Sequence, residues 1–266
     1  MTTNERHPEG QIVVEQRGPV LLMGVDRVEK RNGFTPRMFR ELGEAYTRLE
    51  NSPDLFVGLL YAKGEHFSGG VDLPLMAEYR KAGTPYVPLQ LVDPGQLREP
   101  FRKKPVIGAV QGICFTIAIE LMLSADVVIA ADNCRFAQME VQRGIMPGYG
   151  GSFRLIERAG WGNAMKWLLT GDEFDSAEAL RLGLVQEVVP AGTQFERALA
   201  YAQRVAEQAP LAVQATIENA RLSLGSGWMH AATHCTAKNT FLYGTEDAAE
   251  GRRSFADKRP ARFTGR

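Results

Sequence analysis

Hydrophobic residues follow two different periods along this chain, and each period predicts its own kind of element. Two β-rich runs flank an Arg-Gly-Pro turn within residues 11–25, which predicts an opening hairpin. Residues 35–52 then repeat their apolar side chains at helical spacing, with Thr35 as the expected N-cap and Pro36 at the first helical position. This segment predicts an amphipathic helix.

Continuous apolar runs are typical of strands that are covered on both faces. Such runs predict four buried strands, at 55–64, 104–112, 127–132 and 183–190. A helix is expected at 116–126, and the pattern is helical from about Thr193 to the end of the chain. Alternating strands and helices indicate an α/β architecture with mainly parallel strands. Residues 74–104 carry five prolines and predict only a broken helical excursion.

The apolar run at 106–131 is long enough to suggest a membrane span. Gln111, Glu120 and Asp126 interrupt it, and each central acid would cost roughly 2.5 to 3.5 kcal/mol on insertion. We therefore expect buried core and no membrane partner. Within that core, Glu120 needs either an ion-pair partner such as an arginine or a catalytic task.

Composition narrows the classes of function. Lys plus Arg equals Asp plus Glu at 31 each, so no overall positive field favours a nucleic-acid partner. The three cysteines, Cys114, Cys134 and Cys235, are widely spaced and predict neither a disulfide scaffold nor a metal site. The polar N-terminal residues 1–10 lack the order of a signal peptide, so we expect a cytoplasmic protein with reduced thiols.

Three stretches occur in a characteristic order, with Asp126 beginning a strand between the last two. They are "FSGGVDL" (67–73), "VQGICFTIAIE" (110–120) and "FAQMEVQRGIMPGYGG" (136–151). Together they resemble the enoyl-CoA hydratase/isomerase (crotonase) family. The resemblance extends to residues 168–190 and to the tail at 250–263, so it covers nearly the whole chain.

The resemblance implies a fold and an assembly. The fold is a spiral of repeated ββα units followed by a C-terminal helical trimerisation region. We expect the spiral core domain at 1–195 and the helical region at 196–266. Members assemble as trimers or as dimers of trimers, which implies a homotrimer or homohexamer.

The resemblance also implies which residues act on an acyl-CoA thioester. The backbone N–H groups of Val71 and Ile117 fall where the family places its oxyanion hole, which stabilises an enolate-like thioester oxygen. Glu120 and Glu140 fall on the two acids with which the hydratase branch adds water to a 2-enoyl-CoA. Two carboxylates in one apolar pocket should raise the pKa of at least one of them.

The chain departs from the family pattern beside Glu120. Thr116, Ile117 and Ala118 stand where members usually carry a run of glycines, which makes the backbone less permissive and the pocket wall bulkier. The backbone N–H of Ile117 remains available as a donor despite this exchange. The acyl group is not fixed by the motifs, and we expect its wall to come from residues 74–104.

Coenzyme A carries phosphates and therefore needs local basic side chains. The resemblance places Arg27, Lys30 and Arg31 near the nucleotide and Lys258 near it across a subunit boundary, although solvated surface charge explains each of them as readily. From the first loop, the expected substrate-binding residues are Gly69, Asp72 and Leu73, with Asp72 also suited to bracing the loop. No separate cofactor is expected, because coenzyme A is part of the substrate.

The expected activity is therefore that of an enoyl-CoA hydratase. Isomerisation, decarboxylation or dehalogenation of another acyl-CoA on the same oxyanion hole is the alternative within the enzymes. A non-catalytic acyl-CoA-binding protein is the alternative outside them. His66 and Cys114 are more typical of structural residues than of a base or a nucleophile.

Overall fold

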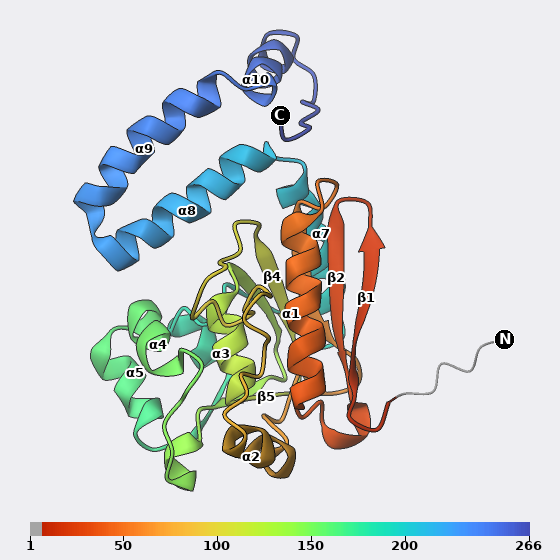
Figure 1. The fold of residues 1–266 in the computed structure, drawn as a ribbon, viewed down its shortest axis with the longest axis vertical. Coiled ribbons are helices and arrows are strands. Elements are labelled where there is room, and N and C mark those ends of the chain that lie inside the picture. Colours follow the sequence, from red (N-terminus) through yellow and green to blue (C-terminus); the bar gives the residue numbers. More distant parts are fainter. Residues whose placement is uncertain (1–6) are drawn as a thin grey trace, which may run out of the picture.

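The computed structural model describes residues 7–266, apart from the side chain of Arg80, so part of the polar N-terminal stretch lies outside the described residues. Its larger sheet has six strands in the order β1-β2-β3-β4-β6-β9 (Figure 1). Their bounds are Gln11–Arg17, Val20–Asp26, Val57–Ala62, Val106–Val110, Val127–Ala131 and Glu187–Val189. Only β1 is antiparallel to its neighbour, which confirms the predicted opening hairpin and the parallel α/β sheet.

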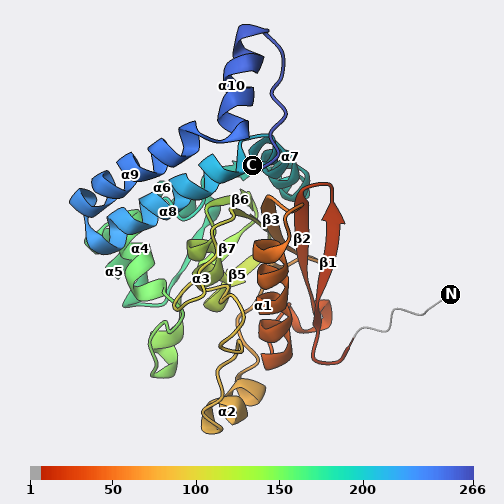
Figure 2. The same cartoon turned by 45° about the horizontal axis from the view of Figure 1, so that its top comes forward.

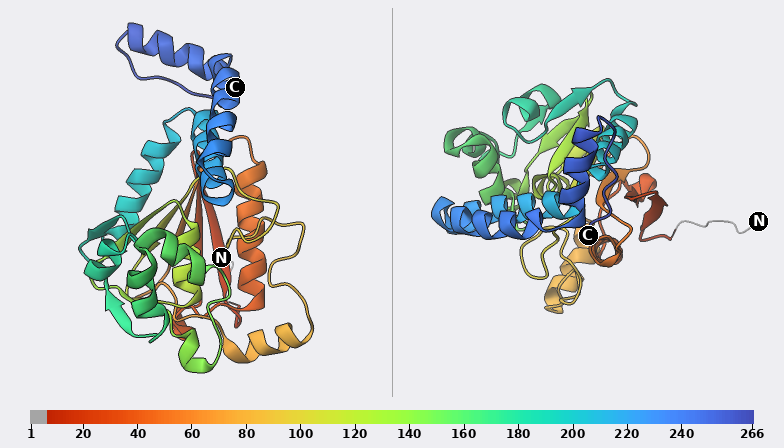
Figure 3. Two further views of the ribbon diagram at one scale, coloured as in Figure 1. Left: turned by 90° about the vertical axis from the view of Figure 1, so that its left-hand side faces the viewer. Right: turned by 90° about the horizontal axis from the view of Figure 1, so that it is seen from above.

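The two faces of this sheet are covered by different helices, α1 (Pro36–Asn51) and α7 (Gln194–Ala206). Side chains alternate along β2, so that Leu21 and Met23 join the core under α1 while Val20 and Leu22 join the core under α7. Figure 3 shows the sheet edge-on between the two helices. Burial on both faces explains why the strands are continuous apolar runs.

The predicted start of α1 is confirmed. The Thr35 side chain accepts a hydrogen bond from the Met38 N–H at 3.2 Å, and Pro36 is the first helical residue, where its missing N–H leaves no bond unmade.

A second, smaller sheet has the strand order β5-β7-β8. Its strands are three residues each, at Ile113–Phe115, Arg135–Ala137 and Glu173–Asp175, and the sequence pattern did not predict them. The chain passes from β4 to β5 and then into α3 (Ile117–Ser124), and from β6 to β7 before α4 (Gly151–Ala159). These are the ββα units of the expected spiral.

The remaining helical segments lie between the strands and in the C-terminal part. They are η1 (Val28–Lys30), α2 (Leu73–Lys81), η2 (Glu140–Arg143), α5 (Trp161–Leu168), α6 (Ser176–Arg181), α8 (Pro210–Ser226), α9 (Trp228–Tyr243) and α10 (Glu246–Ala256). Figure 2 shows α8 and α9 side by side and α10 projecting away from the strands. The expected division at residue 195 falls inside α7, which packs on the sheet, so the helices that leave the sheet begin with α8.

The expectation of helix to the very end of the chain is wrong for residues 257–266, which follow α10 without helical structure. Here Asp247 accepts hydrogen bonds from the N–H groups of Thr264 and Gly265, at 2.7 and 2.8 Å. A buried carboxylate therefore holds the end of the chain against α10.

The apolar run at 106–131 folds as β4, β5, α3 and β6, as expected for buried core. No helix within residues 7–266 has the length and apolar character needed to cross a membrane. The excursion at 74–104 contains α2 and then irregular backbone up to β4, as the prolines predicted.

Candidate functional site

The structure brings the four sequence-predicted residues Val71, Ile117, Glu120 and Glu140 around one pocket of about 500 Å³. Its wall is otherwise mainly apolar, and its large apolar and aromatic side chains include Phe39, Leu73, Met76, Tyr86, Met139, Ile145, Met146 and Tyr149. From residues 74–104, which are expected to form the wall of the acyl group, Met76, Ala77 and Tyr86 line this pocket. Segments far apart in the sequence thus meet at a single cavity.

The Val71 amide points away from the strand-like bridge that fixes its loop. Phe34 forms a parallel bridge with Val71, donating to the Gly70 carbonyl at 2.9 Å and accepting from the Asp72 N–H at 2.8 Å. These bonds use the residues on either side of Val71, so its own N–H faces the opposite way. Within the described chain the Val71 N–H donates no hydrogen bond.

The Ile117 amide is free for a different reason. Ile117 is the first residue of α3, where an N–H has no acceptor inside the helix. It finds none elsewhere among the described residues. The helix dipole adds partial positive charge at this end, so the two amides together can stabilise a developing oxyanion.

Glu120 lies one turn into α3 and is only 3% exposed. Its Oε1 accepts hydrogen bonds from the backbone N–H groups of Tyr149 at 2.6 Å and Gly151 at 2.9 Å. Burial raises the pKa of Glu120, while these two bonds and the charge of Arg154 act in the opposite direction. Both bonds fall on Oε1, which leaves Oε2 for a ligand.

An ion pair with an arginine would explain Glu120 as a structural residue. No salt bridge to Glu120 occurs in the described part of the chain. The guanidinium of Arg154 instead donates to the carbonyls of Gly95 and Gln96, at 2.6 and 3.1 Å. Glu120 is therefore held by backbone amides and not by a countercharge.

Glu140 begins η2 and is 9% exposed. Its Oε2 is buried without a hydrogen-bond partner among residues 7–266. Burial raises the pKa of Glu140 to about 7; its own backbone N–H lowers the pKa, and the nearby charge of Glu120 raises it further. A carboxyl that titrates near neutrality can both accept and donate a proton in a catalytic cycle.

A second pocket of about 230 Å³ adjoins the first and shares Gly69 and Val71 with it. The side chains of Lys30 and Arg31 line this smaller pocket and are exposed. An extended ligand could therefore pass from these two cations, along the glycine, to the free amide of Val71.

Arg27 and Asp72 also line the smaller pocket, but they brace the loop. Arg27 is 5% exposed and its Nη1 donates to Asp72 at 2.9 Å and to the Gly33 carbonyl at 3.0 Å. Asp72 in turn accepts from the Leu75 N–H at the start of α2. The predicted bracing role of Asp72 is thus confirmed.

The last two expected substrate-binding residues, Leu73 and Lys258, have different positions. Leu73 lines the larger pocket and is 54% exposed. Lys258 follows α10, which lies at the opposite end of the molecule from α2, and neither pocket includes it (Figure 1). A single chain does not bring Lys258 to the site, so its contact across a subunit boundary stays a prediction.

His66 and Cys114 have structural positions, as expected. The ring Nδ1 of His66 accepts from the Ile113 N–H at 3.4 Å, and Cys114 is fully buried, which raises the pKa of its thiol well above the usual value. No cluster of three or more His, Cys, Asp or Glu side chains in the described residues could hold a metal ion.

The sequence reasoning missed the aromatic side of the larger pocket. Phe39 stacks on Tyr86 at 5.3 Å between ring centroids and meets Tyr149 edge-on at 5.9 Å. The Tyr149 hydroxyl donates to Asp93, which fixes the residue whose N–H holds Glu120. The helical spacing of apolar residues in 35–52 predicts only that Phe39 faces the core, and a contact between residues 93 and 149 leaves no local signal in the sequence.

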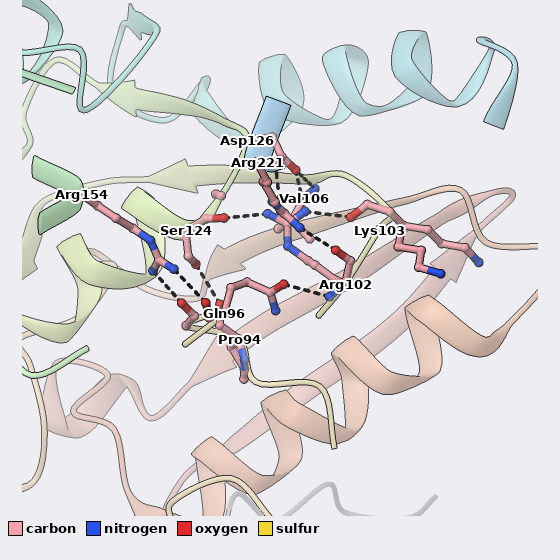
Figure 4. Close-up of polar contacts among 12 residues, drawn as sticks. Pro94, Gln96, Arg102, Lys103, Val106, Ser124, Asp126, Arg154 and Arg221 are labelled. Atoms are coloured by element: carbon pink, nitrogen blue, oxygen red, sulfur yellow. Dashed lines mark hydrogen bonds and ion pairs between the residues drawn. The ribbon is translucent and has the colours of Figure 1, made fainter. Parts of the chain in front are cut away.

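A second polar group, the Arg102 cluster, consists of the buried Arg102 and of Asp126 and Arg221, which are partly exposed (Figure 4). Arg102 is 1% exposed and donates to Asp126 at 2.7 Å and to the carbonyls of Lys104 and Ser124 at 2.8 and 2.6 Å. Arg221, on α8, donates to the Arg102 carbonyl at 2.5 Å and lies 3.5 Å from Asp126. This cluster ties α8 to the strands.

Comparison with known proteins gives relatives over nearly the full length. The family model for enoyl-CoA hydratase/isomerase matches residues 15–266. The 2,3-dehydroadipyl-CoA hydratase of Escherichia coli strain K12 is 33% identical over 258 residues, covering 96% of this chain and 99% of the relative. The carnitinyl-CoA dehydratase of Proteus mirabilis strain HI4320 is 35% identical over 256 residues, covering 94% and 97%.

The fold has similar solved structures as well. The crystal structure of a probable enoyl-CoA hydratase/isomerase from Mycobacterium abscessus matches with a TM-score of 0.94 and 42% identity, covering 96% of this chain and 98% of that one. Sequence motifs, topology and both kinds of relative agree. The chain therefore belongs to the enoyl-CoA hydratase/isomerase family and has the crotonase fold.

Proposed function

We propose that the protein is an enoyl-CoA hydratase, a lyase that adds water across the double bond of a 2-enoyl-CoA thioester. The observation that carries this proposal is the meeting of two buried glutamates and two free backbone amides at one pocket. Relatives named as hydratases over nearly the whole chain support it. Of the reactions open to this family, hydration makes use of both acids.

The two adjoining pockets suggest how the substrate lies. Coenzyme A would occupy the smaller pocket, with Lys30 and Arg31 against its phosphates, and the acyl group would occupy the larger one. The shared residues Gly69 and Val71 then lie beside the thioester. Because coenzyme A arrives with the substrate, the proposed reaction needs no separate cofactor.

The order of proton transfers follows from the protonation states of Glu120 and Glu140. Glu120 holds the water through Oε2 and takes one proton as the water oxygen bonds to the β-carbon. The electron pair of the double bond moves to the thioester oxygen, which accepts hydrogen bonds from Val71 and Ile117. Protonated Glu140 supplies the proton to the α-carbon on the same face. A proton passed from Glu120 to Glu140 restores the pair.

The test is turnover of crotonyl-CoA and of longer 2-enoyl-CoA esters by the purified protein. Hydration removes the ultraviolet absorbance of the conjugated thioester and adds the mass of one water. A product of unchanged mass would identify an isomerase, and loss of a fragment would identify a decarboxylase or dehalogenase. Binding of coenzyme A esters without any product would indicate a non-catalytic member of the family.

We also propose that the protein assembles as a homotrimer or homohexamer through its C-terminal helices. Large apolar side chains on α9 and α10 are exposed in the single chain, including Trp228 at 71%, Phe241 at 62% and Phe255 at 88%. Patches of this kind mark interaction surfaces. Mass measurement in solution tests the assembly, and a monomer at micromolar concentration would overturn it.

A further inference from the structure

Thr116 has a backbone conformation that a threonine rarely adopts. Its φ is 53° and its ψ is −115°, in a region that favours glycine and that is least compatible with a β-branched side chain. Such strain persists only where the surroundings impose it, and it is concentrated at functional sites. Thr116 immediately precedes Ile117, whose amide is one of the two free donors.

The Thr116 hydroxyl does not serve the fold in the usual way. Threonine at a helix N-cap normally accepts a hydrogen bond from the first turn, yet Thr116, the N-cap of α3, makes no side-chain capping bond. Within residues 7–266 its hydroxyl has no hydrogen-bond partner, and the residue lines the larger pocket together with Glu120 and Glu140. The hydroxyl is thus available to a ligand.

The Thr116 hydroxyl lies against the opposite loop. A Cβ placed on Gly70 would lie 2.7 Å from Thr116 Oγ1, so the hydroxyl fills the space beside the residue that precedes Val71. Gly70 itself has φ 114°, which a side chain would strain. Thr116 is therefore next to Ile117 along the chain and next to the Val71 loop in space.

We infer that Thr116 supplies a third donor to the oxyanion hole, with its Oγ–H directed at the thioester oxygen between the N–H groups of Val71 and Ile117. The inference rests on the proposed binding of a thioester in this pocket. A hydroxyl here replaces hydrogen bonding that water would otherwise provide and strengthens as negative charge develops on the oxygen. The strained backbone is what places the side chain at this point.

The experiment compares Thr116→Val, which keeps the branched shape, with Thr116→Ser, which keeps the hydroxyl, and Thr116→Gly, which removes both the hydroxyl and the strain. We expect kcat for crotonyl-CoA to fall roughly 10- to 100-fold in the valine and glycine variants and to change little in the serine variant. The melting temperature should rise by a few degrees in the glycine variant.

A second readout separates this inference from the proposed activity. A chromophoric cinnamoyl-CoA ester shifts its absorbance to the red when the thioester carbonyl is polarised by hydrogen bonds. We expect a smaller shift for the valine and glycine variants than for the wild type or Thr116→Ser. This result would support the contact even if no enoyl-CoA is hydrated. If the wild type turns over crotonyl-CoA and Thr116→Val keeps both its kcat and its absorbance shift, the inference is wrong. An unchanged absorbance shift in Thr116→Gly would also overturn it.

Discussion

The Arg102 cluster and the glutamate pair both contain buried charged groups, but only the cluster pairs its charges, around Arg102 and the partly exposed Asp126. Asp126 accepts from Arg102 and from the Val106 N–H, each at 2.7 Å, with Arg221 nearby. Glu140, in contrast, has a buried oxygen with no partner in the described chain and a pKa raised to about 7. Paired charges at depth indicate a structural role, whereas acids left without countercharge indicate chemistry.

The largest expected effect comes from replacing one of the two unpaired glutamates in the pocket. Glu140→Gln keeps the shape of the side chain but removes its proton transfer, so kcat for a 2-enoyl-CoA should fall roughly 10³-fold. Steady-state ultraviolet assays measure it. Glu173→Gln, an exposed acid paired with Arg135, is the matched control and should keep wild-type kcat. Full activity in Glu140→Gln would contradict the assigned role.

Breaking the ion pair of Arg102 and Asp126 should lower the free energy of unfolding. Arg102→Met removes the buried partner of Asp126 and should lower the free energy of unfolding by about 3 to 5 kcal/mol. Chemical denaturation measures the change. Arg135→Met breaks an exposed ion pair, with Arg135 58% exposed, and should cost less than about 1 kcal/mol. Equal losses in the two variants would show that burial does not distinguish these pairs.

The sequence predicted the larger sheet better than the smaller one. The first hairpin and α1 carry strong local signals, including the Thr35 cap and Pro36, and both were found as expected. The strands β5, β7 and β8 have three residues each, too few to show a period of two. They are fixed by pairing with distant segments and not by local preference.

The candidate site likewise has a part that the sequence predicts and a part that it does not. Glu120 and Glu140 could be located because a motif carries each of them, and the structure places both at one pocket. The anchoring of Glu120 could not be predicted, since it depends on Tyr149 and on the bond from Tyr149 to Asp93. The conformation of Thr116 has no sequence signal either, because threonine does not favour positive φ.

A smaller effect, on pH dependence, sharpens the contrast between paired and unpaired acids. Folded Glu140 holds its proton up to about pH 7, whereas the unfolded carboxyl releases it near 4.5. The folded state therefore binds more protons between these values, and this group makes stability fall as pH rises through the window. Glu140→Gln should be more stable than wild type by about 2 to 3 kcal/mol at pH 8.

Denaturation curves at pH 4, 6 and 8 test this sign. The stability advantage of Glu140→Gln should vanish below the pKa of the unfolded carboxyl, since Glu140 is then protonated in both the folded and the unfolded state. An advantage that is constant across pH would come from packing and not from the charge. A loss of stability at pH 8 would mean that the buried oxygen of Glu140 has a stabilising partner.

The smallest effect concerns the apolar wall of the pocket, which carries neither paired nor unpaired charge. Tyr86 stacks on Phe39 beside the acyl space, so Tyr86→Ala should weaken binding of long or aryl-substituted enoyl-CoA esters while leaving proton transfer intact. An aromatic contact contributes about 0.5 to 1.5 kcal/mol, which predicts a rise in KM of up to roughly tenfold at nearly constant kcat.

A panel of enoyl-CoA esters that differ in length and branching measures this prediction, with Trp161→Ala as the control on exposed α5. Crotonyl-CoA should be almost unaffected by Tyr86→Ala, because its short chain ends before the aromatic rings. A fall in kcat for every ester would instead mean that Tyr86 acts through Phe39 and Tyr149 on the anchoring of Glu120. The wall would then belong to the catalytic machinery, and the boundary between binding and chemistry would lie further from the two acids.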